Sequence, residues 1–391
     1  MAQRRLWLVV VLAAYFLAAL CYVFITPLWQ APDEPAHYNY VRDVATRLSL
    51  PVLQPGDYPH DYLEELKAAH FPPERSIASI RYEGHQPPLY YILAAVVLMP
   101  LRDSALAAQV YALRLLSVFL GLVVIVLTYR LGRHLWPSSG GKAVAIAAAS
   151  AFVPMHTAVS AAINNDALAE MLLLAAVLQA IGLKCEEGSS LDRPPKWKGA
   201  REVSAPAMTG LLVGLCLVTK MTAFIALPLA MLAFLLRNLS LKRREGASPS
   251  RHGKGGGVLG SSLAALCLPA FALWVPWLIR NMAIYGLGDP FGQARHDAVV
   301  MGQLRTAEQL AQVGLSAMLR EGARLTFESF WGIFGWMGVP MHEQVYLVLA
   351  LVTALAIGGL AIRVWHGVRW SASQQRGLLL LAAWACCRLP S

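Results

Sequence analysis

The chain has 391 residues, of which 57% are hydrophobic and only 14% are charged. This composition lies outside the range of soluble domains and indicates a polytopic membrane protein. The formal charge of +10 does not indicate a nucleic-acid partner, because the basic residues gather in short segments between apolar runs, as in cytoplasmic loops of membrane proteins. The six cysteines lie in apolar runs, beside a basic loop or near the C-terminus, so they encode neither a disulfide framework nor a zinc cluster.

The first apolar run, 6–32, carries no charge and follows Arg4 and Arg5. A signal peptide is the alternative, but the run is longer than a signal peptide's apolar core and further apolar runs follow. It therefore predicts a transmembrane helix with a cytoplasmic N-terminus. The next segment, 29–85, holds nine acidic residues against five Lys and Arg and is expected on the outer side.

The apolar stretch 86–101 opens with two prolines and has 16 residues, fewer than the roughly 20 that a spanning helix needs. An odd number of crossings must separate the outer segment from the first basic loop. We therefore expect 86–101 to lie along or dip into the outer face, and the first outer loop, 29–114, to carry membrane-parallel helices. Basic segments that indicate cytoplasmic loops lie at 129–142, 184–202, 237–256 and 363–376.

The remaining apolar runs complete a single integral membrane domain over 1–391, of all-α class. Further crossings are expected at 115–129, 143–162 and 167–183, on both sides of Lys220, and at 257–278 and 343–362. The other expected segments are a basic cytoplasmic linker at 237–256, a second large outer loop at 279–342 and an incomplete, truncated end at 377–391.

This path brings the polar candidates to one face of the membrane, where charges are costly and indicate a site. Each also has a structural interpretation. Asp33 and Glu34 are suited to the N-cap and first turn of a helix, and Asp166 is suited to an N-cap. Lys220 and Arg280 could snorkel from span ends to the interface.

Taken in order, seven segments resemble the GT-C superfamily of polyprenol-dependent glycosyltransferases. The relatives they resemble most are bacterial membrane proteins related to protein O-mannosyltransferases and to lipid A aminoarabinose transferases. The resemblance covers about residues 1–365, and its most specific element is Asp-Glu followed by His-x-Pro-Pro-Leu. The segments are "APDEPAHYNYVRDVATRLSLP", "EGHQPPLYYILAA", "LRLLSVFLGLVVIVLTYRLGRHLWP", "NNDALAE", "LLVGLCLVTK", "PWLIRNMAIYGLGDPFG" and "SFWGIFGW".

The resemblance implies a GT-C-like helical bundle that moves a sugar from a polyprenyl phosphate to an acceptor hydroxyl, with inversion. By the match, Asp33 is the general base and Glu34 orients it or contacts the acceptor. Asp166 matches a second acidic position used for an acceptor or a metal. The cations expected to hold the donor phosphate are Lys220, Arg280, His85 and Arg114.

The implied setting is a bacterial plasma membrane, with a cytoplasmic N-terminus and the active site on the outer face. The implied partners are membrane lipid, a polyprenyl-phosphate-linked sugar as donor, and an acceptor that is a protein, a polysaccharide or a lipid. A divalent metal is left open, because Asp33, His37, His85 and Asp166 show no recognisable ligand spacing. The alternatives are a transporter or lipid flippase, and a catalytically inactive scaffold with a short C-terminus. The absence of repeated halves disfavours a transporter.

Overall fold

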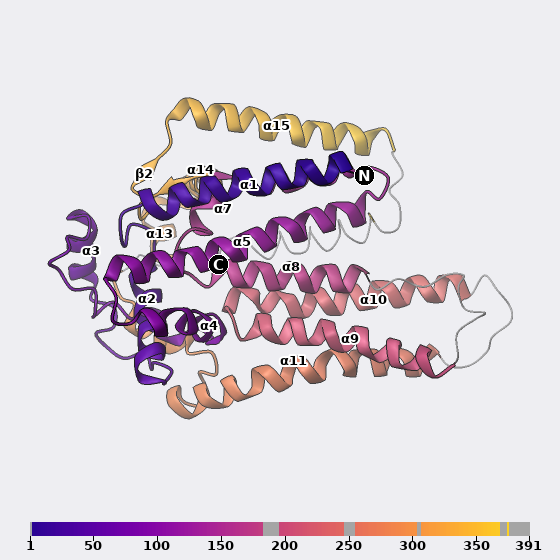
Figure 1. Ribbon diagram of the computed structural model, residues 1–391, viewed down its shortest axis with the longest axis horizontal. Helices are drawn as coiled ribbons and strands as arrows, with labels where there is room; N and C mark the ends of the chain where they lie inside the picture. The colour runs from indigo at the N-terminus through magenta and orange to yellow at the C-terminus, as the bar shows by residue number, and fades with distance from the viewer. Residues whose placement is uncertain (1, 183–194, 246–254, 303–305, 368–373, 375–391) are drawn as a thin grey trace.

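The computed structural model of the chain describes residues 2–182, 195–245, 255–302, 306–367 and 374. The truncated end expected at 377–391 and part of the basic linker 237–256 lie outside the described residues. Long helices lie side by side along the long axis, and shorter helices and loops gather at one end (Figure 1). The all-α class is confirmed, since the strands in the described part are one antiparallel pair, β1 (Ile333–Phe334) and β2 (Val339–Pro340).

The elements divide into a bundle and an end layer. We call the end of the bundle where α1 gives way to α2 the Asp33 end. The helices along the long axis are α1 (Ala2–Ile25), α5 (Leu106–Leu135), α6 (Gly140–Ala151), α8 (Asp166–Gly182), α9 (Pro195–Leu217), α10 (Ala226–Glu245), α11 (Gly255–Tyr285) and α15 (Glu343–Trp365). The shorter elements are α2 (Glu34–Arg47), α3 (His60–Ala68), η1 (Tyr82–His85), α4 (Leu89–Leu98), η2 (Met99–Leu101), α7 (Pro154–Val159), η3 (Met221–Ile225), α12 (Gln293–Val299), α13 (Thr306–Val313) and α14 (Leu315–Trp331).

Several helices have the composition of membrane spans. In the described part of the chain, four are long and apolar enough to cross a bilayer, and shorter apolar helices accompany them. The chain is therefore a multi-pass membrane protein. The four are Arg5–Ile25, Leu106–Leu135, Gly260–Tyr285 and Glu343–Trp365, and the shorter ones are Leu89–Leu101, Ala205–Leu217 and Met221–Leu236.

The expected crossing at 143–162 is not one continuous helix. It consists of α6 and α7, which are separated at Phe152 and Val153, and Pro154 occupies the first turn of α7. Proline disfavours the helical conformation of the residue before it and has no N–H for the helix ladder, so the chain breaks there and restarts.

The stretch 86–101 forms α4 and η2 and stays at the Asp33 end. The α4 helix has 10 residues, and a helix of that length extends about 15 Å, half of a bilayer's hydrocarbon core. The following helix, α5, begins at the same end, because the Tyr38 hydroxyl of α2 donates to Gln109 Oε1 of α5 at 2.5 Å.

Small residues allow close packing inside the bundle. Gly210 and Gly214, one turn apart on α9, face α11 so closely that a Cβ on Gly210 would lie 2.0 Å from the Leu266 carbonyl oxygen. A Cβ on Gly214 would lie 3.0 Å from the Ala270 Cα. This spacing of two glycines is the small-xxx-small pattern with which membrane helices associate, and it holds α9 and α11 together.

Candidate functional site

Asp33 occupies the corner between α1 and α2. Its backbone lies in the left-handed region, with φ 61°, a conformation that Asp tolerates better than most residues. It is the N-cap residue of α2, and its carbonyl accepts from His37 N at 3.0 Å, but its carboxylate makes no capping hydrogen bond. Instead, Asp33 Oδ1 accepts a hydrogen bond of 2.5 Å from the Tyr82 hydroxyl. The Asp33 carboxylate is therefore held by Tyr82 and does not cap α2.

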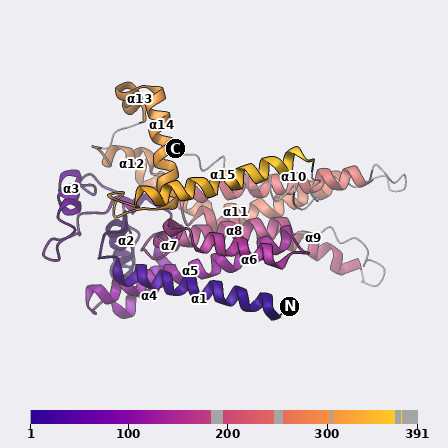
Figure 2. The same cartoon turned by 90° about the horizontal axis from the view of Figure 1, so that it is seen from above.

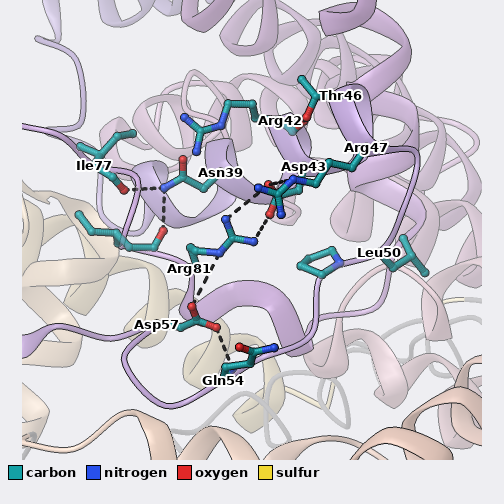
Figure 3. Close-up of polar contacts among 12 residues, drawn as sticks. Asn39, Arg42, Asp43, Thr46, Arg47, Leu50, Gln54, Asp57, Ile77 and Arg81 are labelled. Atoms are coloured by element: carbon teal, nitrogen blue, oxygen red, sulfur yellow. Dashed lines mark hydrogen bonds and ion pairs between the residues drawn. The ribbon is translucent and has the colours of Figure 1, made fainter.

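A polar network on α2 fixes the loop that delivers Tyr82. Arg81 reaches back to the Asp43 carboxylate of α2 and, at 3.7 Å, to Asp57 (Figure 3). Asn39 Nδ2 donates to the carbonyls of Ile77 at 2.6 Å and Ile80 at 2.8 Å. These contacts anchor the segment just before Tyr82, so its hydroxyl arrives at Asp33 in a defined position.

The surroundings of Asp33 favour its neutral form. Burial raises the pKa of the Asp33 carboxyl, and the Tyr82 hydrogen bond and the charge of Lys220 lower it only in part. Burial also raises the pKa of Tyr82 well above its ordinary value, so its hydroxyl stays protonated and donates. A carboxyl with a raised pKa holds a proton more firmly than a solvated one, as a general base near neutral pH requires.

Glu83 joins the same cluster. Its side chain is buried, and its Oε2 atom has no hydrogen-bond partner. Burial, followed by the negative charge of Asp33, raises the pKa of Glu83 to about 8, although Lys220 lowers it in part. Asp33 and Glu83 thus compete for protons in one low-dielectric site.

Lys220 and Asp166 complete the cluster as an ion pair. Lys220 Nζ lies 2.7 Å from Asp166 Oδ2, between the end of α9 and the start of α8. Burial lowers the pKa of Lys220, but the carboxylates of Asp166, Glu83 and Asp33 raise it more, and the ammonium stays charged. Lys220 is therefore turned toward the acidic cluster and does not snorkel to the membrane interface. Asp166 lies in the first turn of α8, where its charge complements the helix dipole, and its side chain also forms the ion pair with Lys220.

Glu34 and Arg114 have a different role from the predicted one. They form a bidentate ion pair, with side chains 0% and 1% exposed, at 2.6 and 2.7 Å. Arg114 also donates to the carbonyls of Val23, Thr26 and Pro27, so each of its five N–H groups has an acceptor. No donor is left for a phosphate, and Glu34 has no access to an acceptor, so both residues are structural.

Arg280 and His85 are also held by the protein. Arg280 donates to the carbonyls of Leu50 and, at 2.7 Å, Pro51, which ties the first loop to α11. His85 Nδ1 lies 3.0 Å from the Tyr82 carbonyl oxygen and must therefore carry the hydrogen. Burial lowers the pKa of His85 to about 4, so its Nε2 is an acceptor and cannot donate to a phosphate. Lys220 remains as the predicted cation that faces the acidic cluster.

The described residues contain no group of three or more His, Cys, Asp or Glu side chains placed to hold a metal ion. His37, named with Asp33, His85 and Asp166 as a candidate ligand, is engaged through Nδ1 with the Tyr91 hydroxyl at 2.8 Å. Burial lowers the pKa of His37 to about 3, so it is neutral and acts as a hydrogen-bond partner within the core of the end layer.

Strained backbone gathers beside Asp33. Trp29, Phe71 and Trp336 share its left-handed conformation, with φ of 69°, 52° and 55°. They also contact one another: Trp336 Nε1 donates to the Trp29 carbonyl at 2.8 Å, and the Phe71 ring stacks on Trp336. The Lys67 ammonium lies 4.5 Å from the Trp336 ring centroid. Strained backbone of this kind persists only where the surrounding structure imposes its geometry. Here the contacts of Trp336 with Trp29 and Phe71 join the β1–β2 turn to the segment between α1 and α4.

Two site residues, Tyr82 and Glu83, were missed in the sequence. For Glu83 a signal was present, because it opens the segment "EGHQPPLYYILAA" that carries part of the family resemblance, whereas Tyr82 lies just before that segment.

The fold and this cluster define an all-α, multi-pass membrane protein with a partly buried polar cluster at one end of its bundle. The chain belongs to the DUF2142 family of predicted membrane proteins, whose model matches residues 64–387. Asp33 precedes the matched segment, whereas Tyr82, Asp166 and Lys220 lie within it.

No curated protein matches the sequence. Among solved structures, the chain is similar to the oligosaccharyltransferase of Archaeoglobus fulgidus, crystallised with a tethered acceptor peptide, at 14% identity and a TM-score of 0.46. The match covers 91% of this chain and 38% of that enzyme. At this level the similarity assigns no function.

Proposed function

We propose that the protein is a membrane glycosyltransferase of the GT-C type, which transfers a sugar from a polyprenyl-phosphate carrier to an acceptor hydroxyl. The observation that supports this best is the partly buried Asp33 carboxyl, which is bound by Tyr82 at the end of a membrane bundle and lies within the electrostatic influence of the Lys220 ammonium. A lipid-borne sugar would present its anomeric carbon at this boundary, where the proposed base and the proposed cation lie.

In the proposed reaction the acceptor oxygen attacks the anomeric carbon while the bond from that carbon to the phosphate oxygen breaks. The acceptor's proton passes to Asp33, and the polyprenyl phosphate leaves with the bonding electrons as an anion. Attack opposite to the leaving group inverts the anomeric configuration. A positioned general base of this kind contributes about a hundred- to ten-thousand-fold to the rate.

Lys220 is the cation proposed to meet the leaving phosphate. A fixed positive charge aimed at developing negative charge stabilises the transition state without reorganisation. The ammonium is paired with Asp166 in this structure, so binding of a phosphate would share or replace that contact.

The proposed setting is a bacterial plasma membrane with the N-terminus in the cytoplasm and the Asp33 end outside. The acceptor is proposed as a hydroxyl of a protein, a polysaccharide or a lipid that arrives from the aqueous side. No step in the proposed reaction requires a metal ion. Whether sugar transfer depends on a divalent cation is decided by measuring the transfer rate with and without a chelator.

The test is sugar transfer from a polyprenyl-phosphate donor by purified wild type and Asp33→Asn at equal folded amounts. The amide keeps the size of the side chain and an oxygen that can accept from Tyr82, but it takes up no proton near neutral pH. We expect transfer to fall at least about a hundredfold, with thermal stability close to that of wild type. Turnover within a factor of two of wild type would remove Asp33 from the chemistry.

Donor binding separates the role of Lys220 from that of Asp33. Lys220→Ala should weaken binding of the polyprenyl-phosphate sugar about 10- to 150-fold, since a hydrogen bond to a charged group is worth about 1.5 to 3 kcal/mol. Lys142→Ala is the matched control, because this exposed lysine lies at the opposite end of the bundle, where α5 passes to α6. Equal affinities of the two variants would contradict the phosphate-binding role.

A further inference from the structure

The α14 helix has two chemically distinct faces. Leu315, Leu319 and Phe330 follow one side at helical spacing, and each is more than half exposed. The opposite side carries Arg324 and Glu321, which form an exposed ion pair. An apolar stripe of this kind on a helix outside the bundle requires a partner, because water is a poor environment for three large side chains.

The orientation of α14 indicates which partner fits. In Figure 2 the α14 helix runs across the direction of α1 and α15, and it lies near the level at which these spans reach the Asp33 end. Because α1 and α15 are membrane spans by length and composition, a helix that runs across them is oriented roughly along the membrane plane, as interfacial helices are.

The chain on the C-terminal side of α14 supports the same placement. A short hairpin of β1 and β2 follows α14, and the span α15 begins at Glu343. The Tyr346 hydroxyl of α15 donates to the Gly332 carbonyl at 2.7 Å, which fixes the end of α14 beside the start of a membrane span. The adjacent rings of Phe330 and Trp331 add the aromatic residues that are enriched at membrane interfaces.

The charged face forms its own contacts. Arg324 pairs with Glu321 and, at 3.0 Å, with Glu328, so its positive charge is balanced within the helix. A protein that covered the stripe would shield it from lipid and from water alike. A lipid surface covers the stripe alone and leaves the charges in water, as the two-faced pattern requires.

We propose that α14 is an interfacial helix at the Asp33 end of the bundle, whose Leu315, Leu319 and Phe330 side chains insert among lipid acyl chains, with Arg324 directed to water. The ligand of this surface is the bilayer itself. The proposal depends on the membrane spans and not on the proposed sugar transfer, so each can fail without the other.

Spin labels on the full-length protein in phosphatidylethanolamine and phosphatidylglycerol vesicles test the proposal. Leu319→Cys and Glu321→Cys, made in a background without native cysteines, place labels on opposite faces of α14. We expect the Leu319→Cys label to collide mainly with dissolved oxygen and the Glu321→Cys label mainly with a water-soluble nickel chelate. Thr326→Cys and Arg320→Cys repeat the comparison should either first variant fail to fold.

The contrast between the two faces decides the outcome. A severalfold higher ratio of oxygen to nickel collisions on the Leu319 face supports insertion into lipid. A Leu319→Cys label that meets nickel as readily as the Glu321→Cys label would overturn the proposal. A label shielded from both reagents would also overturn it, because protein rather than lipid would then cover the stripe.

Discussion

At the scale of single residues, Glu83 is the acid whose environment departs most from water. It follows Tyr82 in η1, is buried, and leaves its Oε2 atom without a partner. Burial and the charge of Asp33 raise its pKa from 4.5 to about 8. At neutral pH Glu83 therefore holds a proton, which removes one negative charge from the neighbourhood of Asp33.

The raised pKa of Glu83 makes a prediction about stability. The folded state binds the proton more tightly than the unfolded state, so the stabilisation is complete below about pH 4.5 and is lost as the pH rises toward about 8. This one group changes the free energy of unfolding by at most about 1.4 kcal/mol per pH unit in that window. Glu83→Gln should therefore flatten the pH dependence of the melting temperature between about pH 5 and 8.

Glu74→Gln is the matched control, because Glu74 is an exposed acid of the same loop. Its melting curves should follow those of wild type across the pH range. A Glu83→Gln curve that is parallel to the wild-type curve at every pH would show that Glu83 titrates as it does in water.

Parts of this site could be predicted from the sequence. The charge distribution and the number of crossings put Asp33, Asp166 and Lys220 on one face, and the structure joins Asp166 to Lys220 directly. The partner of Asp33 could not be deduced in this way, because Tyr82 lies 49 positions further along the chain. Its approach depends on the contacts of Arg81 and Asn39 with α2 and the adjoining loop, which leave no periodic signal.

At the scale of elements, the Glu34–Arg114 pair joins α1, α2 and α5. Arg114 is a residue of the span α5, and its guanidinium collects the last carbonyls of α1 and the first acidic residue of α2. Glu34 Oε1 also accepts from Ile163 N at 3.3 Å, which adds the segment before α8. The sequence suggested a catalytic role for Glu34 and a phosphate-binding role for Arg114, because burying a charge at a membrane boundary is energetically unfavourable. Here the two charges offset that unfavourable free energy by pairing with each other.

Removing one partner of this pair should be strongly destabilising. Glu34→Gln or Arg114→Met alone should lower the free energy of unfolding by about 3 to 5 kcal/mol, because the other group is left buried without its partner. The double variant should cost less than the sum of the single ones. The measurement is denaturant unfolding in detergent, with the exposed pair Arg75 and Glu65 as a control worth about 0 to 1 kcal/mol. Single variants as stable as wild type would assign the pair another role.

Breaks and close contacts between elements were less visible than the elements themselves. The sequence predicts an apolar run over 143–162, and the break between α6 and α7 follows from Pro154 inside it. The contact of α9 with α11 follows from Gly210 and Gly214, but a pair of glycines does not name its partner helix. Local patterns therefore indicate where helices end or approach closely, while tertiary packing decides which helices meet.

At the scale of the whole molecule, the short α4 helix determines the path of the chain. Because α4 and η2 do not extend through the bundle, residues from α2 to the start of α5 remain at the Asp33 end, and α5 then runs to the opposite end (Figure 1). If α4 crossed the membrane instead, every later loop would lie on the opposite side of the membrane. The position of Asp166 and Lys220 beside Asp33 depends on this path.

Cysteine labelling tests that path in an intact membrane. In a background without native cysteines, Asp61→Cys and Leu287→Cys place exposed thiols at the Asp33 end, and Ser138→Cys places one at the turn between α5 and α6. If the Asp33 end faces outward, an impermeant thiol reagent applied to whole cells should label the first two and spare the third until the membrane is permeabilised. The reverse pattern would keep the fold but turn the site toward the cytoplasm, away from the acceptors proposed here. Labelling of Asp61→Cys and Ser138→Cys from the same side would mean that α4 crosses the membrane. Asp33 and Lys220 would then lie on opposite sides of the membrane and could not form one site.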